Sequence, residues 1–396
     1  MVGPVRADGL RLALFTDTYT PQMNGVARTL ERLARTIAAR GGAVRVVTVA
    51  DPDARDARDA RGVHDADGAA VGVERWPSVP FWAYPQLRVA PLMVNRAAAV
   101  IDEWRPTLVH AATEFGVGLA GMFAARAAGV PLVSSYHTHF RAYLEFYRLG
   151  ALGPVFWPLF RGIHNMGART FAPSAVVARE LAALRFHNLR VWTRGVDPSL
   201  FDSSFRSAAM RARLGARHER DVVVLYVGRL AREKGIDVLA RAWRLAAASP
   251  GVRFAVVGDG PAEAEFRAAA PEGTCFMGRL TGRALSEAYA SADLFAFPSV
   301  TETFGNVVLE AMASGLAVVA PDVGATTEYA TAETAQLFRG GDATSLAEAI
   351  GLLVHDAPLR AGLVSRSRAL AARMTWEAVF DQLLTDYREV VATARP

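Results

Sequence analysis

Residues 297–315 read FPSVTETFGNVVLEAMASG, a stretch that combines two carboxylates with an otherwise apolar helical pattern. Glu302 lies in a polar turn, and Glu310 follows within the apolar run VVLEAM. A helix with these neighbours is buried on nearly all sides, and a charge there costs roughly several kcal/mol unless it is hydrogen-bonded. Gly315 is typical of the residue that ends a helix. Glu310 is therefore either a structural carboxylate with a partner inside the fold or a ligand-binding group.

The length and composition predict two domains. A chain of 396 residues exceeds the length of about 300 residues at which single cores stop growing. The apolar content of 52% is sufficient for two cores, and the formal net charge of +5 is modest. No basic run with interleaved aromatic residues is present, so the charge favours phosphate or an anionic surface and does not indicate nucleic acid.

The cysteine content and the hydropathy indicate the compartment. Cys275 is the single cysteine, which excludes an internal disulfide framework and fits a reducing compartment. No apolar run reaches the roughly 18 residues of a membrane-spanning helix, and the N-terminus lacks the apolar stretch of a signal peptide. We therefore expect a cytoplasmic protein, with peripheral contact at the inner face of the membrane as an open alternative.

One basic residue differs from all the others. Of the 44 basic side chains only Lys234 is lysine, and the rest are arginine. An ammonium is a compact point charge that a planar guanidinium does not reproduce. Lys234 therefore either reflects chance or marks a place where a compact charge is required.

The first half of the chain alternates between strand and helix patterns. A strand over 10–16, a polar turn, a helix over 26–40 and a strand over 43–50 predict a parallel unit. Asn24-Gly25 in the turn is either ordinary turn chemistry or a point where backbone amides approach a phosphate. The same alternation continues with strands over 107–111, 131–136 and 170–174, and with helices over 97–104, 117–128, 162–169 and 175–184.

His137 follows the strand over 131–136, where a doubly wound sheet places its ligands. His137 and His139 form a His-x-His pair, but no further cluster with metal-ligand spacing follows, which favours a hydrogen-bonding histidine. The aromatic-rich segments 76–92 and 140–160 either pack on the core or face a ligand or a bilayer. The charged, repetitive segment 51–70 indicates a surface loop without a catalytic role.

A second alternating series follows a turn-rich stretch at 194–198, which places a domain boundary near residue 195. Its strands are expected over 221–227, 253–257, 274–277, 294–296 and 317–320. The turns that contain Gly228-Arg229, Gly258 and Gly278-Arg279 follow the first three of these strands. They are therefore expected at one edge of a second parallel sheet.

Read in order, six motifs carry a resemblance to a known family: PQMNGVARTL, SYHTHF, GRLAREKG, VGDGP, FMGRL and SADLFAFPSVTETFGNVVLEAMASGLAVVAPDVG. With them the chain resembles the retaining glycosyltransferases of GT-B architecture that carry a Glu-x7-Glu motif. The resemblance implies an α/β fold of two Rossmann-like, doubly wound parallel-sheet domains with a donor cleft between them. The implied domains are an acceptor-side domain over 1–195, a nucleotide-sugar-binding domain over 196–374, and a helix over 375–396 that crosses back to the first domain.

The resemblance also implies roles for individual residues. Arg229 and Lys234 would neutralise the donor diphosphate, which gives the solitary lysine a function. Glu302 and His137 would contact the transferred sugar, and Glu310 would accept hydrogen bonds from the ribose hydroxyls. The other donor-binding positions that the resemblance implies are Asn24, Gly25, Gly228, Gly278, Arg279, Phe304, Gly305 and Asn306.

The implied reaction is transfer of a hexosyl group from a nucleotide-sugar donor to a lipid or glycan acceptor, with retention by same-face substitution. Neither a metal nor another cofactor is expected, and no Asp-x-Asp motif is assigned. The resemblance favours mannosyl transfer from GDP-mannose to a lipid-linked acceptor. The alternatives are a UDP-sugar-dependent glycolipid synthase, such as a glucosyl or sulfoquinovosyl diacylglycerol synthase, a nucleotide-sugar epimerase of the same architecture, and a catalytically silent binding module.

Overall fold

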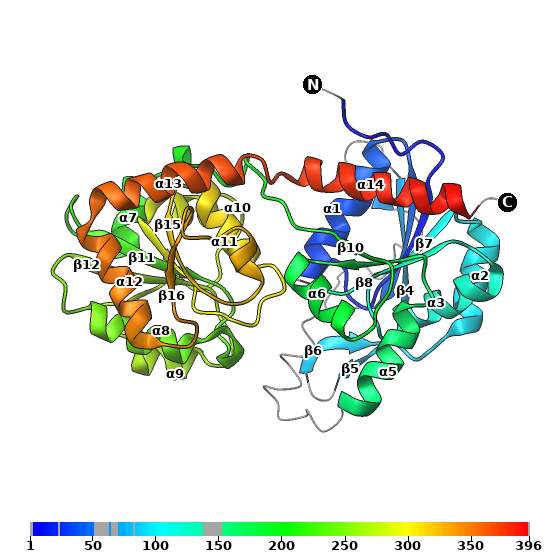
Figure 1. The fold of residues 1–396 in the computed structure, drawn as a ribbon, viewed down its shortest axis with the longest axis horizontal. Helices are drawn as coiled ribbons and strands as arrows, with labels where there is room; N and C mark the ends of the chain where they lie inside the picture. The colour runs from blue at the N-terminus through cyan, green and yellow to red at the C-terminus, as the bar shows by residue number, and fades with distance from the viewer. Residues whose placement is uncertain are drawn as a thin grey trace. The chain divides into compact units, whose positions relative to one another are not determined.

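The computed structural model describes residues 3–22, 24–50, 63–64, 70–81, 84–137 and 153–394. The chain divides into two compact units, the first made of Met1–Thr193 with Val379–Pro396 and the second of Arg194–Ala378. Each unit contains one sheet of mainly or wholly parallel strands with helices on both faces (Figure 1). The α/β class expected from the alternating pattern is therefore confirmed.

The first sheet has eight strands in the order β10-β9-β8-β7-β1-β2-β4-β3, and all its pairs are parallel except β3–β4. Strand β1 (Arg11–Phe15) lies between β2 (Ala43–Val49) and β7 (Leu108–Ala111), so the strand order reverses at this point. Ligands of doubly wound sheets bind at the carboxyl ends of the strands beside such a reversal. The other strands are β3 (Val63–His64), β4 (Ala70–Trp76), β8 (Leu132–Ser135), β9 (Arg169–Ala172) and β10 (Leu189–Val191).

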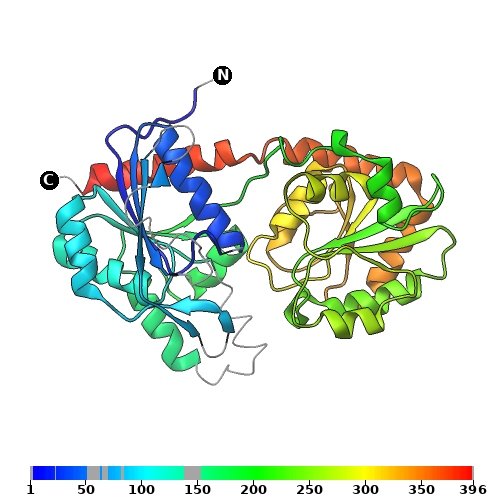
Figure 2. The ribbon, with the colours of Figure 1, turned by 180° about the vertical axis from the view of Figure 1, so that it is seen from behind.

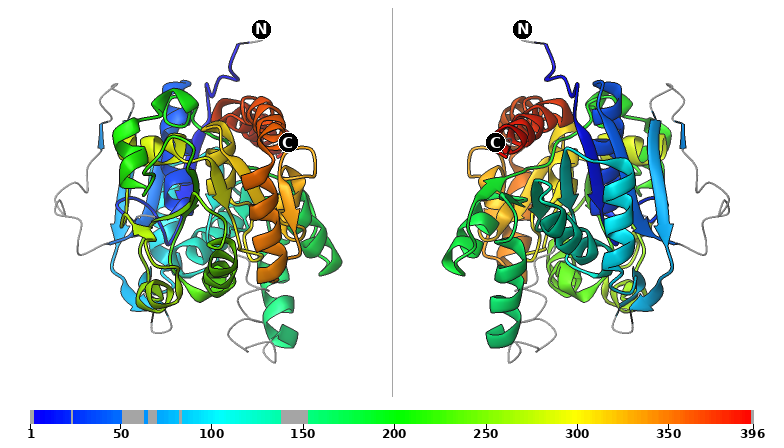
Figure 3. Two further views of the ribbon diagram at one scale, coloured as in Figure 1. Left: turned by 90° about the vertical axis from the view of Figure 1, so that its left-hand side faces the viewer. Right: turned by 90° about the vertical axis from the view of Figure 1, so that its right-hand side faces the viewer.

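Helices cover both faces of this sheet. Helix α1 (Gly25–Ala39) lies on one face, and α2 (Val94–Trp104) and α3 (Gly116–Ala128) lie on the other (Figure 3). Helix α1 begins where the Asn24 side chain accepts a hydrogen bond from the Ala27 amide at 2.8 Å, and it buries an apolar stripe that includes Leu30, Leu33 and Ile37. The unit also contains α5 (Gly153–His164), α6 (Ala175–Ala183) and most of α14 (Trp376–Thr393).

The structure corrects three local expectations. The segment 76–92, in which no strand was predicted, contains an antiparallel hairpin of β5 (Val79–Phe81) and β6 (Tyr84–Val89). Strand β3 and the first residue of β4 fall within the expected loop over 51–70, most of which lies outside the described residues. A helix was expected over 162–169, but α5 already ends at His164, and residues 165–168 form a turn that leads into β9 at Arg169.

The C-terminal helix α14 is anchored in the first unit through a buried histidine. The His110 ring on β7 is fully buried, with Nδ1 2.6 Å from the Tyr387 hydroxyl and Nε2 2.5 Å from the Ser135 hydroxyl. A neutral imidazole has one donor and one acceptor nitrogen, so both contacts are satisfied without a charge. Burial lowers the pKa of His110 to about 3. Ion pairs of Asp381 with Arg40 and of Asp386 with Arg169, each at 2.5 Å, hold the same helix.

We expect His110 to make stability depend on pH. The pKa in the folded chain is about 3, below the ordinary value of 6.5, so below pH 6.5 only the unfolded chain takes up the proton. The contribution is complete above pH 6.5 and falls by about 1.4 kcal/mol per pH unit as the pH drops toward 3. Urea unfolding at pH 7.5 and 5.5 should show this loss in the natural chain and less of it in His110→Asn. The exposed His355 provides the control, and His355→Asn should behave like the natural chain; equal pH dependence in all three proteins would contradict the expectation.

The second sheet has six parallel strands in the order β13-β12-β11-β14-β15-β16. Its strands are β11 (Val222–Val227), β12 (Val252–Val257), β13 (Cys275–Phe276), β14 (Leu294–Ala296), β15 (Ala317–Pro321) and β16 (Gln336–Phe338). Its helices are α7 (Ala208–Arg213), α8 (Ile236–Ala246), α9 (Glu263–Ala269), α10 (Gly282–Ser291), α11 (Asn306–Ala313), α12 (Ala343–His355) and α13 (Ala357–Ala371), with short 3-10 turns at Ser203–Phe205, Arg232–Lys234 and Ala325–Glu328.

Two apolar clusters fill the two faces of this sheet. One contains Trp243 of α8 and Leu346 of α12, and the other contains Tyr289 of α10 and Met312 of α11. The view from behind shows helices above and below the sheet of this unit (Figure 2). Because the sheet is buried on both faces, its strands are continuous apolar runs such as VVVLYV in β11.

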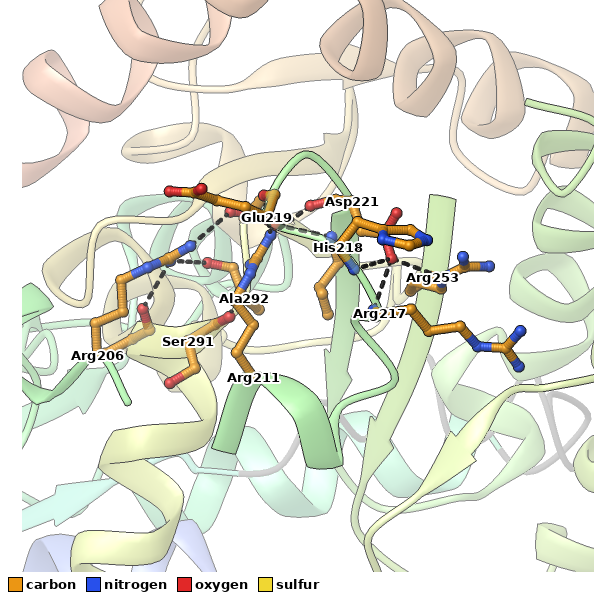
Figure 4. A network of polar contacts seen from close by, with 12 residues as sticks. Arg206, Arg211, Arg217, His218, Glu219, Asp221, Arg253, Ser291 and Ala292 are labelled. Carbon is orange, nitrogen blue, oxygen red and sulfur yellow. Dashed lines mark hydrogen bonds and ion pairs between the residues drawn. The ribbon is translucent and has the colours of Figure 1, made fainter. Parts of the chain in front are cut away.

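The amino-terminal edge of the second sheet is held by arginines. Arg211 donates to the Asp293 carboxylate at 2.7 Å and to the backbone carbonyl of Asp221 (Figure 4). The Asp221 carboxylate accepts hydrogen bonds from the Arg217 amide at 2.8 Å and from Arg253 at 3.1 Å. These contacts join α7, β11 and β12 at the edge opposite the carboxyl-end turns, which indicates a structural role.

No helix in the described part of the chain has the length and apolarity needed to cross a membrane.

Candidate functional site

Three turns at the carboxyl edge of the second sheet are tied together through their backbones. Gly228, Gly258 and Gly278 follow β11, β12 and β13, and the Gly258 amide donates to the Gly278 carbonyl at 2.8 Å. Gly258 has φ 135°, and a Cβ there would lie 2.0 Å from the Gly228 carbonyl oxygen. Only glycine permits this conformation and this approach. Arg279 lies at the rim, half exposed and 2.9 Å from Asp259.

Lys234 and Glu302 form an ion pair at this edge, with Nζ 2.5 Å from Oε1. Their side chains remain 21% and 25% exposed, so both can still reach a ligand. Gly235 follows Lys234 with φ 69° and packs so closely that a Cβ would lie 2.9 Å from the Pro298 carbonyl oxygen. The Thr301 hydroxyl donates to the Glu233 carbonyl at 2.9 Å. The loop after β11 and the loop after β14 are therefore fixed to each other.

Arg229 stands beside this pair. Its Nη1 lies 3.8 Å from Glu233 Oε1, and its backbone carbonyl accepts a hydrogen bond from the Tyr226 hydroxyl at 3.1 Å. Burial, with a smaller effect from the carboxylates of Glu302 and Glu233, raises the pKa of Tyr226, so its phenol stays protonated and donates. The edge therefore presents two cations, Arg229 and Lys234, from one loop.

Helix α11 starts at this edge without a side-chain cap from the described residues. Gly305 precedes it with φ 89°, and the Tyr329 hydroxyl donates to the carbonyls of Phe304 and Gly305 at 2.7 and 2.8 Å. Burial, together with the charges of Glu302, Glu328 and Glu310, raises the pKa of Tyr329 well above its usual value. A helix start with uncapped amides favours an anionic ligand. Asn306 is the first residue of this helix.

Glu310 has a partner inside the fold. Its Oε2 accepts a hydrogen bond from the Tyr289 hydroxyl at 3.0 Å, while the residue itself is only half-buried. The neighbours Val308, Leu309, Ala311 and Met312 are buried, as the apolar pattern predicted. The two alternatives for Glu310 are therefore compatible, because a structural partner holds one oxygen and the side chain is still accessible.

The other predicted residues lie in the first unit, at the carboxyl edge of its own sheet. Asn24 and Gly25 are exposed at the start of α1, after the loop that follows β1. His137 is buried just beyond the end of β8, with its ring 5.5 Å from that of Trp192. Both positions lie at the carboxyl ends of their strands. His139 lies outside the described residues, so the His-x-His pair stays a prediction.

Two buried carboxylates at the carboxyl edge of the first sheet were not predicted. Asp17 follows β1 and accepts hydrogen bonds from the Val117 amide at 2.9 Å and the Thr113 hydroxyl at 2.7 Å. Glu114 follows β7, with Oε1 3.4 Å from His164 Nε2. Burial raises the pKa of both carboxyl groups. Their positions after strands were visible in the sequence, but their partners lie about 100 and 50 residues away.

Among the described residues, no group of three or more histidine, cysteine or acidic side chains lies where it could hold a metal ion. The predicted residues of the second unit, Gly228, Arg229, Lys234, Gly278, Arg279, Glu302, Phe304, Gly305, Asn306 and Glu310, all lie on the loops or helix starts at its carboxyl edge or, for Glu310, within α11. The roles given to them by resemblance stay predictions.

Comparisons with known proteins agree with this architecture. The family described as Glycosyltransferase Family 4 matches residues 23–200, and the family described as Glycosyl transferases group 1 matches residues 221–356. A GDP-mannose-dependent alpha-mannosyltransferase of Mycobacterium tuberculosis is 34% identical over 386 residues, which cover 96% of this chain and 97% of that protein. The sulfoquinovosyl transferase of Arabidopsis thaliana is 31% identical over 381 residues, 93% of this chain and 71% of that protein.

Among solved structures, sucrose-phosphate synthase from Thermosynechococcus elongatus aligns with a TM-score of 0.76 at 22% identity, covering 97% of this chain and all of that one. At this identity the likeness shows the fold, which is GT-B. Both family matches describe glycosyltransferases and so favour that reading of the chain over the epimerase alternative. The chain is thus a glycosyltransferase, and it belongs to the family whose first domain is of the family 4 type and whose second domain is of the group 1 type.

Proposed function

We propose that the chain is a retaining mannosyltransferase that takes its sugar from GDP-mannose and passes it to a lipid-linked or glycan acceptor. The observation that carries the proposal is the juxtaposition of Lys234, Glu302 and Arg229 beside the uncapped start of α11. The choice of donor is supported by the 34% identity to the mycobacterial GDP-mannose-dependent enzyme.

The residues fit the chemistry of a nucleotide-diphosphate leaving group. The bond between the anomeric carbon and the diphosphate oxygen breaks, and the acceptor oxygen bonds to the same face of that carbon. The departing phosphate oxygen takes the acceptor's proton. Arg229, Lys234 and the amides of α11 would stabilise the charge that builds on the phosphate, which is a large effect when the groups are fixed in advance.

Lys234 can serve both the protein and the donor. An ammonium has three N–H donors, so one can stay on Glu302 while another binds a phosphate oxygen. Glu302 keeps its second oxygen for a sugar hydroxyl. Glu310 would hold the ribose, and His137 in the first unit would contact the transferred sugar. We propose no metal, because these cations supply the positive charge that a metal would otherwise bring.

A UDP-sugar-dependent glycolipid synthase is the second candidate, because the sulfoquinovosyl transferase of Arabidopsis thaliana covers nearly the same span at 31% identity. A lipid acceptor would agree with contact at a membrane surface. In α5 the Leu159 side chain is 63% exposed, whereas Phe160 is buried. The residues 140–152 of the expected amphipathic segment lie outside the described residues, so the membrane contact stays a prediction.

A nucleotide panel tests the proposal. GDP-mannose and GDP should stabilise the chain by roughly 2.7 kcal/mol at a hundredfold excess over Kd, whereas UDP-glucose and UDP should not. Stabilisation by UDP-sugars alone would select the second candidate, and no stabilisation by any nucleotide would contradict both. Transfer of mannose to a lipid extract should continue in EDTA, and nuclear magnetic resonance of the product should show the α-anomer that retention requires. A β-anomer would exclude same-face substitution.

A further inference from the structure

Tyr289 lies behind the proposed ribose site and has no assigned role. It belongs to α10, next to α11 (Figure 1), and its side chain is fully buried. Its ring meets Phe201 edge-on at 5.6 Å and lies 5.9 Å from the ring of Phe295. A ring held on two sides has little freedom, so its hydroxyl is fixed in position. That hydroxyl donates to Glu310 Oε2 at 3.0 Å.

Glu310 requires such a partner if it is to recognise ribose. A glutamate side chain has three rotatable bonds, and its oxygens accept but do not donate hydrogen bonds. Two adjacent ribose hydroxyls are bound well only when the carboxylate plane is already oriented, since ordering a free side chain at binding costs affinity. The Tyr289 hydroxyl holds Oε2 of Glu310. Because a carboxylate is planar, this contact also restricts the direction in which Oε1 points.

The phenol of Tyr289 also suits this role because it carries no charge. A neutral phenol fixes the carboxylate without cancelling its charge, whereas an arginine or lysine would compete with the ribose for it. The two carboxylates of the motif thus have different partners, because Glu302 is paired with Lys234 and Glu310 with Tyr289.

We propose that Tyr289 is a positioning residue that orients Glu310 and thereby sets the preference for a ribose with free 2′- and 3′-hydroxyls. This inference rests on the proposed function, since it assumes that Glu310 faces the donor nucleotide. Tyr289 itself does not touch the donor.

The test compares nucleotides that differ only in the ribose. Calorimetric titration of the full chain with GDP and UDP, and with their 2′,3′-dideoxy forms, gives the ratio of affinities. In the natural chain we expect the preferred nucleotide to bind at least about tenfold tighter than its dideoxy form, as for hydrogen bonds to a charged group. Tyr289→Phe keeps the ring and should reduce that ratio to a few-fold, leave binding of the dideoxy form unchanged, and raise KM for the donor more than it lowers kcat.

Tyr329→Phe is the matched control. It removes a second buried hydroxyl, but this one holds the backbone at Phe304 and Gly305. It should weaken the ribose and dideoxy forms by the same factor, because it acts on the start of α11. If Tyr289→Phe keeps the natural ratio, or weakens both forms equally, the inference is wrong.

Two further outcomes must be distinguished from a failure of the inference: a variant that does not fold, and a natural chain that binds no nucleotide. If Tyr289→Phe does not fold, Glu310→Gln removes the charge that the tyrosine orients and should also abolish the preference, and a retained preference would overturn the inference. If the natural chain binds neither GDP nor UDP, the proposed function fails. If it binds one of them with no preference for ribose, only the inference fails.

Discussion

Replacing Lys234 with alanine is expected to lower kcat for sugar transfer about 100- to 1,000-fold, the loss seen when a fixed group that stabilises transition-state charge is removed. Lys234 is the single lysine of the chain, and its Nζ lies 2.5 Å from Glu302 Oε1. Its removal takes away a cation from the leaving group and leaves the three-quarters buried Glu302 carboxylate without that partner. The donor should therefore bind more weakly as well. Steady-state kinetics with labelled GDP-mannose measures both effects.

Lys234→Arg keeps the positive charge but changes its shape, and it should have less activity than the natural chain. The variant therefore separates the effect of the shape of the cation from the effect of its charge. The Gly235 turn packs against the Pro298 carbonyl and fixes the loop that carries Lys234, and a planar guanidinium does not reproduce a compact ammonium. Arg232→Ala is the control from the same short helical turn, because Arg232 is exposed and pairs with the exposed Glu265. It removes one positive charge and should keep activity near the natural level. A Lys234→Ala chain with kcat within threefold of the natural value would refute the assigned role.

The sequence was sufficient to predict the alternating strands and helices and the sheet edge at which the candidate site lies. Strands such as β11 are continuous apolar runs, and glycines such as Gly305 and Gly315 flank α11, so local patterns predicted both elements. Parallel strands place their carboxyl ends together, and this rule alone grouped the Gly228-Arg229, Gly258 and Gly278-Arg279 turns at one edge, whereas Glu302 was added by the resemblance.

The partners of the site residues could not be predicted. The contacts of Tyr289 with Glu310 and of Tyr329 with Gly305 join side chains and backbone about 20 residues apart, and Asp17 reaches the start of α3 across about 100 residues. Such pairings depend on how helices pack on the sheet, which periodicity does not encode. No strand was predicted in the segment of β5 and β6. Proline is rare in the middle of a sheet, and these two strands form a pair apart from the two large sheets.

Gly258→Ala should have the largest effect on stability among single substitutions at this edge. A Cβ at this position would lie 2.0 Å from the Gly228 carbonyl oxygen, and φ 135° is a conformation open almost only to glycine. Neither backbone segment can move freely, because Gly228 N is bonded to the Val257 carbonyl at 3.0 Å and Gly258 N to the Gly278 carbonyl at 2.8 Å. We expect the free energy of unfolding to fall by more than about 3 kcal/mol, the sum of backbone strain and steric overlap.

The same substitution should also reduce activity in the fraction that folds, because the overlap displaces the Gly228-Arg229 turn. Gly273→Ala is the control: its φ of 80° is also positive but lies in the left-handed region, and no atom would lie within 4 Å of the new Cβ. Its cost is the left-handed strain alone, about 1–2 kcal/mol. Chemical unfolding of both variants therefore shows how much the overlap and the more extreme φ of Gly258 cost beyond left-handed strain, and kinetics at a temperature where both are folded measures the displacement of Arg229. If the two variants lose equal stability, the close contact between the β11 and β12 turns does not constrain the site, and the position of Arg229 must be fixed by its other contacts, those of Tyr226 and Glu233.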